Sequence, residues 1–125
     1  MTSFVSPQKQ ILYIDDSFDS GELVRFVLSE PVYQVIAVQT MMEGLNLARN
    51  NRFNLYLVDT VFVDGTGFEF CQQIRAFDPK TPIVFCTADV LEETQREAIR
   101  FGAQAFLTKP IDIDQLAATV ARLTA

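Results

Sequence analysis

The feature that most constrains the fold is a regular alternation of short apolar runs with segments of helical spacing. The runs cover residues 11–14, 32–38, 55–58, 83–87 and 105–108. Strands that alternate with helices form parallel sheets, and nearly continuous apolar runs are typical of strands that are covered on both faces. The sequence therefore predicts an α/β fold with a doubly wound, five-stranded parallel sheet.

Polar residues indicate where the intervening helices begin. A Ser, Thr or Asp followed three residues later by Glu or Gln is the pattern of a capping box, and it occurs at Thr40, Thr66, Asp89 and Asp112. We expect helices to begin after these four positions. We also expect Leu91 and Ile113 to face inward, Pro31 to close the first helix, and Gly102 to follow the end of the fourth.

Length and composition favour one folded domain. The chain has 125 residues, of which 49% are apolar, and this content argues against disorder. We expect a flexible N-terminal tail at residues 1–9 and a single domain over residues 10–125. The net charge of −6, without basic clusters, argues against direct binding of nucleic acid or of a membrane surface. With no secretion signal or apolar run of about 20 residues, a cytoplasmic location is expected.

Four of the five apolar runs end in side chains that suit metal or phosphate chemistry. These side chains are Asp15 and Asp16, Asp59, Thr87, and Lys109. Each alone is compatible with an ordinary turn, cap or surface residue. In an open parallel sheet, however, the carboxyl ends of the strands share one rim, where ligands bind. Three carboxylates gathered there repel one another unless a cation intervenes, and Mg²⁺ prefers oxygen ligands.

At this point the sequence resembles the receiver domains of two-component response regulators, including the single-domain chemotaxis regulator. The similarity extends from about residue 10 to residue 123, and it rests on the segments 13–17, 57–59, 64–69, 85–88 and 106–110. The resemblance implies a flavodoxin-like (βα)5 fold with strand order 2-1-3-4-5.

The resemblance also implies a role for each matching residue. Asp59 would be the phosphoacceptor. The ligands of Mg²⁺ (or Mn²⁺) would be Asp15, Asp16, Asp59 and the backbone carbonyl of Val61. Lys109 would pair with Asp59 or with a phosphoryl oxygen, and the peptide bond between Lys109 and Pro110 would be cis.

Two further positions match residues that change position in this family when the domain is phosphorylated. Thr87 would form a hydrogen bond with the phosphoryl group, and Phe106 would be the aromatic switch residue. Phe106 lacks the hydroxyl group of tyrosine, so we expect its inward position to be favoured. The readout surface would comprise the helix after Asp89, the strand 105–108 and the helix after Asp112.

The phosphoryl donor must come from outside the chain, because the chain has no histidine to be phosphorylated. A histidine kinase or a histidine phosphotransfer protein is expected, together with an unknown downstream target. No output domain follows Ala125, so we expect a stand-alone receiver that is not a turnover enzyme.

Val63 replaces a proline found in many members of the family. Val61 and Asp89 occupy positions that tune phosphate lifetime, and we expect moderate-to-slow dephosphorylation.

Three other functions fit parts of this pattern. A phosphatase of the haloacid dehalogenase type also uses an aspartate nucleophile with Mg²⁺, but it requires an Asp-x-Asp motif that is missing here. A binding module that works without phosphorylation is the second alternative. A flavodoxin-like cofactor binder is the third, although the acidic pair Asp15 and Asp16 would repel a phosphate in the absence of a metal.

Overall fold

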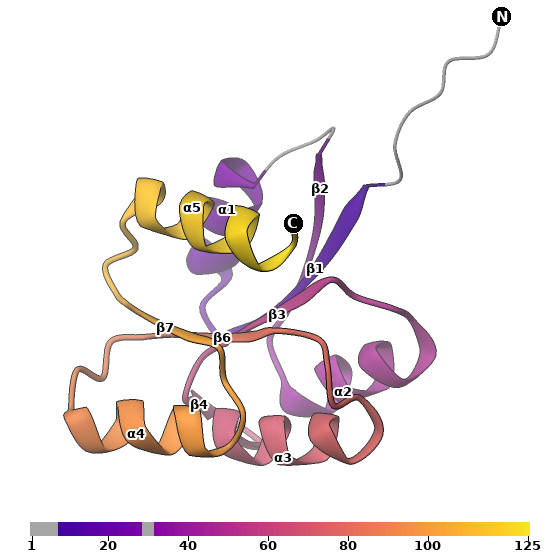
Figure 1. Ribbon diagram of the computed structural model, residues 1–125, viewed down its shortest axis with the longest axis vertical. Coiled ribbons are helices and arrows are strands. Elements are labelled where there is room, and N and C mark those ends of the chain that lie inside the picture. The colour runs from indigo at the N-terminus through magenta and orange to yellow at the C-terminus, as the bar shows by residue number, and fades with distance from the viewer. Residues whose placement is uncertain (1–7, 29–31) are drawn as a thin grey trace, which may run out of the picture.

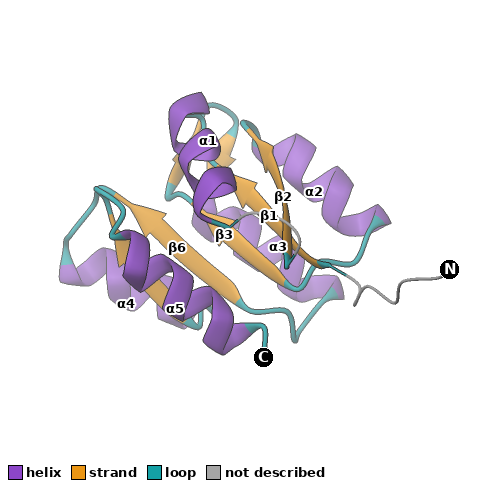
Figure 2. Cartoon of the chain, turned by 90° about the horizontal axis from the view of Figure 1, so that it is seen from above, coloured by secondary structure: helices purple, strands orange, loops and turns teal. Residues whose placement is uncertain are grey.

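A parallel sheet lies between two layers of helices in the computed structural model, which describes residues 8–28 and 32–125 (Figure 1, Figure 2). The strand order is β2-β1-β3-β6-β7. In that order the strands are Tyr33–Val38, Lys9–Ile14, Leu55–Val58, Ile83–Thr87 and Ala105–Thr108. All their pairings are parallel. The predicted fold class and the predicted order 2-1-3-4-5 are therefore confirmed.

The helices divide between the two faces of the sheet. Figure 1 shows α1 (Phe18–Val27) and α5 (Ile113–Leu123) on one face, and α2 (Met41–Asn50), α3 (Gly67–Phe77) and α4 (Glu92–Arg100) on the other. Successive side chains of a strand point to opposite faces. In β1, Ile11 and Tyr13 accordingly join the core cluster with α1 and α5, whereas Leu12 and Ile14 join the cluster with α2 and α3.

Strand register brings the ends of the strands to one rim. Ile14 lies opposite Val58, and Val58 lies opposite Phe85. The next residues extend this alignment, since the backbone N–H of Asp59 donates to the carbonyl of Ile14 at 3.0 Å. The acids that follow β1 and β3 therefore begin from neighbouring positions.

Three of the four predicted helix caps are confirmed. The side chains of Thr40, Thr66 and Asp112 accept hydrogen bonds from backbone N–H groups three residues later. The expected cap at Asp89 is wrong, because α4 begins later, with Leu91 at its N-cap. The carboxylate of Asp89 instead accepts from the N–H of Leu91 and the hydroxyl group of Thr94.

Two residues that were expected to face inward are exposed. Leu91 is 62% exposed and Ile113 is 51% exposed. Leu91 precedes α4, so the helical spacing does not extend to it. Ile113 is the first residue of α5, and that helix is buried through its later residues, Leu116 and Val120. The expected C′ position at Gly102 is supported by its positive φ of 101°.

A short hairpin occupies the segment that was expected to be a loop after β3. It consists of β4 (Val61–Phe62) and β5 (Gly65–Thr66), which pair antiparallel. Asp64 lies at its turn, and its carboxylate accepts from the N–H groups of Met41 and Met42 at 2.8 and 3.0 Å. These two bonds lower the pKa of Asp64. The hairpin is thus tied to the start of α2.

Four phenylalanine rings form a row between β7 and the end of α4. Phe106 is parallel to Phe85, with ring centroids 6.3 Å apart, and Phe68 stacks on Phe85 at 5.3 Å. Phe101, which ends α4, packs against Phe68 at 5.8 Å. We call these four residues the phenylalanine row.

Two predictions concern residues that are only partly described. Pro31, expected to close the first helix, and most of the expected tail at residues 1–9 lie outside the described residues. Of that tail, residues 8 and 9 are described, and Lys9 is the first residue of β1. In the described part of the chain, no helix is long and apolar enough to cross a membrane.

Candidate functional site

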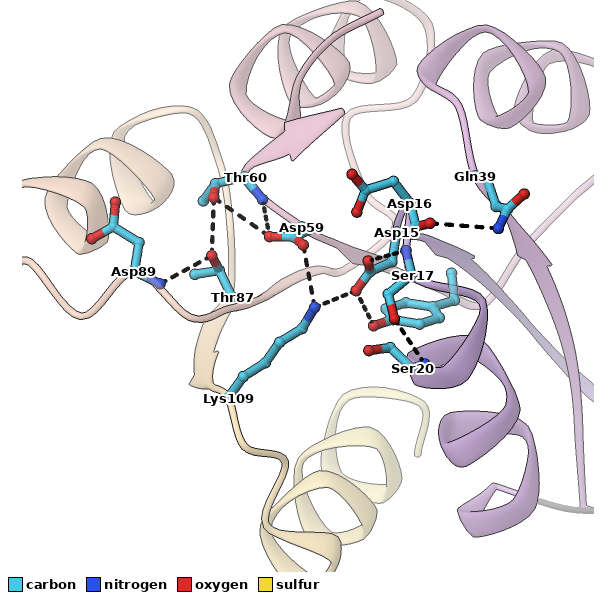
Figure 3. Close-up of polar contacts among 11 residues, drawn as sticks. Asp15, Asp16, Ser17, Ser20, Gln39, Asp59, Thr60, Thr87, Asp89 and Lys109 are labelled. Atoms are coloured by element: carbon cyan, nitrogen blue, oxygen red, sulfur yellow. Dashed lines mark hydrogen bonds and ion pairs between the residues drawn. The ribbon is translucent and has the colours of Figure 1, made fainter. Parts of the chain in front are cut away.

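The carboxyl ends of β1, β3, β6 and β7 place the predicted side chains around one centre, as Figure 3 shows. Asp15 and Asp16 follow β1, Asp59 follows β3, Thr87 ends β6, and Lys109 follows β7. These residues come from distant parts of the chain, so the parallel sheet alone brings them together. The predicted rim is therefore present.

Three carboxylates gather at this rim. Asp15, Asp16 and Asp59 each offer one oxygen, and these oxygens all lie within 4.8 Å of one another. Oxygens on opposite sides of a Mg²⁺ ion are about 4 Å apart, given metal–oxygen distances of roughly 2.0–2.1 Å. Asp15 is buried, Asp59 is half-buried and Asp16 is exposed. The donor set and its spacing fit a hard divalent cation that keeps several water ligands.

Lys109 supplies the positive charge. Its Nζ atom lies 2.5 Å from Oδ2 of Asp15 and 3.2 Å from Oδ2 of Asp59. Partial burial lowers the pKa of Lys109, but the hydrogen bonds and charges of Asp15 and Asp59 outweigh burial and raise it. The lysine therefore remains protonated at neutral pH. The peptide bond from Lys109 to Pro110 is cis, as the family resemblance implied.

Tyr13 is a site residue that the sequence analysis missed. It lies within the apolar run of β1, and its hydroxyl group donates to Oδ2 of Asp15 at 2.5 Å. Burial, reinforced by Asp15, raises the pKa of Tyr13 far above its ordinary value. The backbone N–H of Ser17 donates to the other oxygen of Asp15 at 2.9 Å. The sequence offered one indication of this role, a tyrosine hydroxyl group two residues before an aspartate.

Thr60 is the second missed residue. Its backbone N–H donates to Oδ1 of Asp59 at 2.6 Å, and its hydroxyl oxygen lies 2.9 Å from that of Thr87. The N–H of Asp89 donates to the same hydroxyl of Thr87 at 3.2 Å. The two oxygens of Asp59 are therefore held from opposite directions, Oδ1 by Thr60 and Oδ2 by Lys109 (Figure 3).

The remaining predicted residues lie beside this centre. Phe106 is half-buried and parallel to Phe85 in the phenylalanine row. Val61 begins the hairpin after Asp59, with a side chain that is 63% exposed, and Val63 is 84% exposed. The roles of Phe106 as a switch and of the Val61 carbonyl as a metal ligand stay predictions.

Comparison with known proteins gives a consistent result. The family model described as "Response regulator receiver domain" matches residues 11–121. The response regulator protein PilR of Pseudomonas aeruginosa is 32% identical over 91% of this chain. The transcriptional regulatory protein ZraR of Klebsiella oxytoca is 30% identical over 94% of it. The chain spans 26% and 27% of the lengths of these two relatives, so a stand-alone receiver stays a prediction.

A solved structure agrees with these sequence relatives. Chemotaxis protein CheY4 of Vibrio cholerae superposes with a TM-score of 0.87 and 28% identity, covering 94% of this chain and 99% of that one. Receiver domains are phosphoacceptor signalling domains of two-component systems, and they bind Mg²⁺ at an acidic cluster such as the one formed here by three aspartates. From its fold, its rim of acids and these relatives, the chain belongs to the response regulator receiver domain family.

Proposed function

We propose that Asp59 accepts a phosphoryl group from the phosphohistidine of a histidine kinase or of a histidine phosphotransfer protein. The observation that carries this proposal is the position of the Asp59 carboxylate, which lies beside two further aspartates and contacts Lys109 at 3.2 Å. Asp15, Asp16 and Asp59 would hold Mg²⁺ or Mn²⁺, with the carbonyl of Val61 as a further ligand. The bound ion would neutralise charge on the phosphoryl oxygens.

In the proposed transfer, a carboxylate oxygen of Asp59 attacks the phosphorus atom and forms an acyl phosphate. The phosphorus–nitrogen bond of the donor breaks, and the histidine nitrogen leaves with the electron pair and takes up a proton. Lys109 remains a cation throughout, because its raised pKa keeps it protonated. Its ammonium group balances the negative charge that arrives with the phosphoryl group.

The proposed output is a change of surface. Thr87 would turn its hydroxyl group toward a phosphoryl oxygen, and Phe106 would occupy the space that Thr87 leaves. The altered surface would be formed by α4, β7 and α5, where a downstream protein would bind. Ile99 is 59% exposed on α4, which gives such a partner an apolar contact.

The proposed protein is a signalling component of the cytoplasm and carries one phosphoryl group per chain without turnover of a substrate. A phosphatase of the haloacid dehalogenase type requires a second acid two residues after the nucleophile, and Val61 stands at that position. Asp89 is half-buried, and the hydrogen bonds from Leu91 and Thr94 lower the pKa of its carboxyl group and keep it ionised; it would tune the lifetime of the phosphoryl group.

The test is stoichiometric labelling with radiolabelled acetyl phosphate, with and without Mg²⁺. We expect wild type to incorporate about one phosphoryl group per chain in the presence of Mg²⁺. Asp59→Asn should incorporate none, whereas Asp114→Asn, the same chemical change on α5, should label like wild type. Equal labelling of Asp59→Asn and wild type would remove Asp59 as the acceptor.

A further inference from the structure

A buried hydroxyl group connects the proposed acceptor to the proposed switch residue. Thr60 follows Asp59 directly and is only 7% exposed, although most of the buried side chains are apolar. Its hydroxyl oxygen lies 2.9 Å from that of Thr87 and 3.4 Å from Oδ1 of Asp59. Figure 3 shows that Thr60 contacts both Asp59 and Thr87 and so links the two side chains.

The hydrogen bonds that link Thr87, Thr60 and Asp59 have one arrangement of donors and acceptors that satisfies all of them. The hydroxyl group of Thr87 accepts from the N–H of Asp89 at 3.2 Å. A hydroxyl group has one proton to donate. Asp59 is an acceptor, so Thr60 donates its proton to the carboxylate, and Thr87 then donates its own proton to Thr60. All three bonds therefore point toward Asp59.

This arrangement holds Thr87 in place before phosphorylation. Thr87 is 2% exposed, so no bulk water is available to replace Thr60 as the acceptor of its proton. A hydroxyl group that turns toward a new oxygen must first give up its present acceptor. The bond from Thr87 to Thr60 is therefore lost when Thr87 turns, and its free energy counts against the switch.

We propose that Thr60 is a positioning residue whose hydroxyl group restrains Thr87 in the unphosphorylated chain and so sets the equilibrium of the switch. This inference rests on the proposed function, because it requires that Thr87 serve the phosphoryl group. Thr60 is not among the site residues that the sequence predicts, which are the three aspartates, Lys109, Thr87 and Phe106. Removing the hydroxyl group of Thr60 makes the switch easier, because Thr87 then has no acceptor to leave.

The experiment titrates the Mg²⁺-loaded protein with beryllofluoride, which coordinates a carboxylate oxygen as a phosphoryl group does. Isothermal titration calorimetry gives the affinity. Thr60→Val, which removes the hydroxyl group and keeps the branched shape, should bind beryllofluoride about two- to tenfold more tightly than wild type, as expected for one hydrogen bond. Thr60→Ser restores the hydroxyl group and should bind like wild type. Thr60→Ala carries the same expectation as valine if the valine variant does not fold.

A double-mutant comparison separates restraint from a purely structural effect. In a Thr87→Val background there is no hydroxyl group to restrain, so adding Thr60→Val should leave the affinity unchanged. Affinity in Thr60→Val that is equal to or weaker than wild type would overturn the proposal, as would an equal gain in both backgrounds. Failure of wild type to bind beryllofluoride would instead overturn the proposed function, and this inference with it.

Discussion

Lys109 lies closer to Asp15 than to the proposed acceptor Asp59, with Nζ–Oδ2 distances of 2.5 and 3.2 Å. The side chain of Asp15 is fully buried, whereas that of Lys109 is 19% exposed. A buried carboxylate requires a partner. Lys109 therefore neutralises the same acid that would bind a metal ion, and a bound ion would compete with the lysine for it.

This competition predicts opposite effects of Lys109→Met on stability and on metal binding. Without Lys109 the buried carboxyl group of Asp15 loses its ion-pair partner, so the free energy of unfolding should fall by about 3 kcal/mol in the absence of metal. The affinity for Mg²⁺ should rise by roughly tenfold, because one positive charge near the site is gone. Calorimetric titration and urea denaturation measure these two quantities. Lys80→Met, at an exposed lysine, is the control and should change neither.

The raised pKa of Tyr13 predicts a loss of stability at alkaline pH. The unfolded chain ionises its tyrosines near pH 10, whereas folded Tyr13 keeps its proton. The unfolded state then binds fewer protons, so the free energy of unfolding falls as pH rises above about 10, by up to ~1.4 kcal/mol per pH unit. Below pH 10 this contribution is fully present.

Tyr13→Phe tests the pH effect directly. It should flatten the decline in unfolding free energy between about pH 10 and 11.5, measured by urea denaturation. Tyr33→Phe on β2 is the matched control, because Tyr33 makes no side-chain hydrogen bond within the described residues. The same slope in both variants would contradict the assignment to Tyr13.

Gly67 lies so close to the backbone of Asp59 that adding a methyl group at residue 67 should lower the stability of the fold. A Cβ atom at Gly67 would collide with the backbone carbonyl oxygen of Asp59 and would lie 3.0 Å from the ring of Phe85. Gly67→Ala should therefore lower the free energy of unfolding by about 1–3 kcal/mol. It should also slow labelling with acetyl phosphate, since the backbone of Asp59 must move.

Gly65 provides the comparison for Gly67. A Cβ atom there would clash with the flexible end of Met41 at 2.7 Å, which can move away, and would make an ordinary contact with Glu69 at 3.8 Å. Thermal denaturation of Gly65→Ala should show the smaller loss of the two. If Gly65→Ala cost as much as Gly67→Ala, the contact with the Asp59 carbonyl would not be the cause.

The carboxylate of Asp64 accepts two hydrogen bonds from the first residues of α2 and should stabilise the start of that helix, although Asp64 lies more than 20 residues away in the sequence. Asp64→Ala should destabilise the fold by about 1 kcal/mol at pH 7. The pKa of Asp64 is lowered from 3.8, so this contribution is present above about pH 4 and disappears as pH falls through the folded pKa. Unfolding free energies of wild type and variant should therefore converge in strong acid. A difference that persisted there would show that packing, and not the charge, is responsible.

The sequence contained enough information for the fold because its local patterns agree with one another. The apolar runs gave the strands, and the caps at Thr40, Thr66 and Asp112 located three helix starts. The same local pattern failed at Asp89. Its carboxylate accepts from the N–H of Leu91, just before α4, and from the hydroxyl group of Thr94, in the first turn of α4. The spacing from Asp89 to Glu92 does not distinguish this geometry from a cap.

The site was predictable where residues end strands, and not where contacts depend on side-chain direction. The three aspartates and Lys109 follow from strand ends meeting at one rim. Tyr13 and Thr60 were missed because each looks like an ordinary buried neighbour in the sequence. Only the three-dimensional register shows that the hydroxyl groups of Tyr13 and Thr60 point at the acids.

Through the phenylalanine row, the packing of Phe106 depends on residues that lie outside the site. Phe85 packs against both Phe106 and Phe68, and Phe68 also packs against Phe101 at the end of α4. Phe85 is buried, whereas Phe68, Phe101 and Phe106 are partly buried, so a movement of Phe106 would change its packing against Phe85 and, through Phe85, the contact with Phe68. A smaller side chain at Phe68 would remove contacts with both Phe85 and Phe101, so under the proposed switch the response to phosphorylation would also depend on a residue of α3.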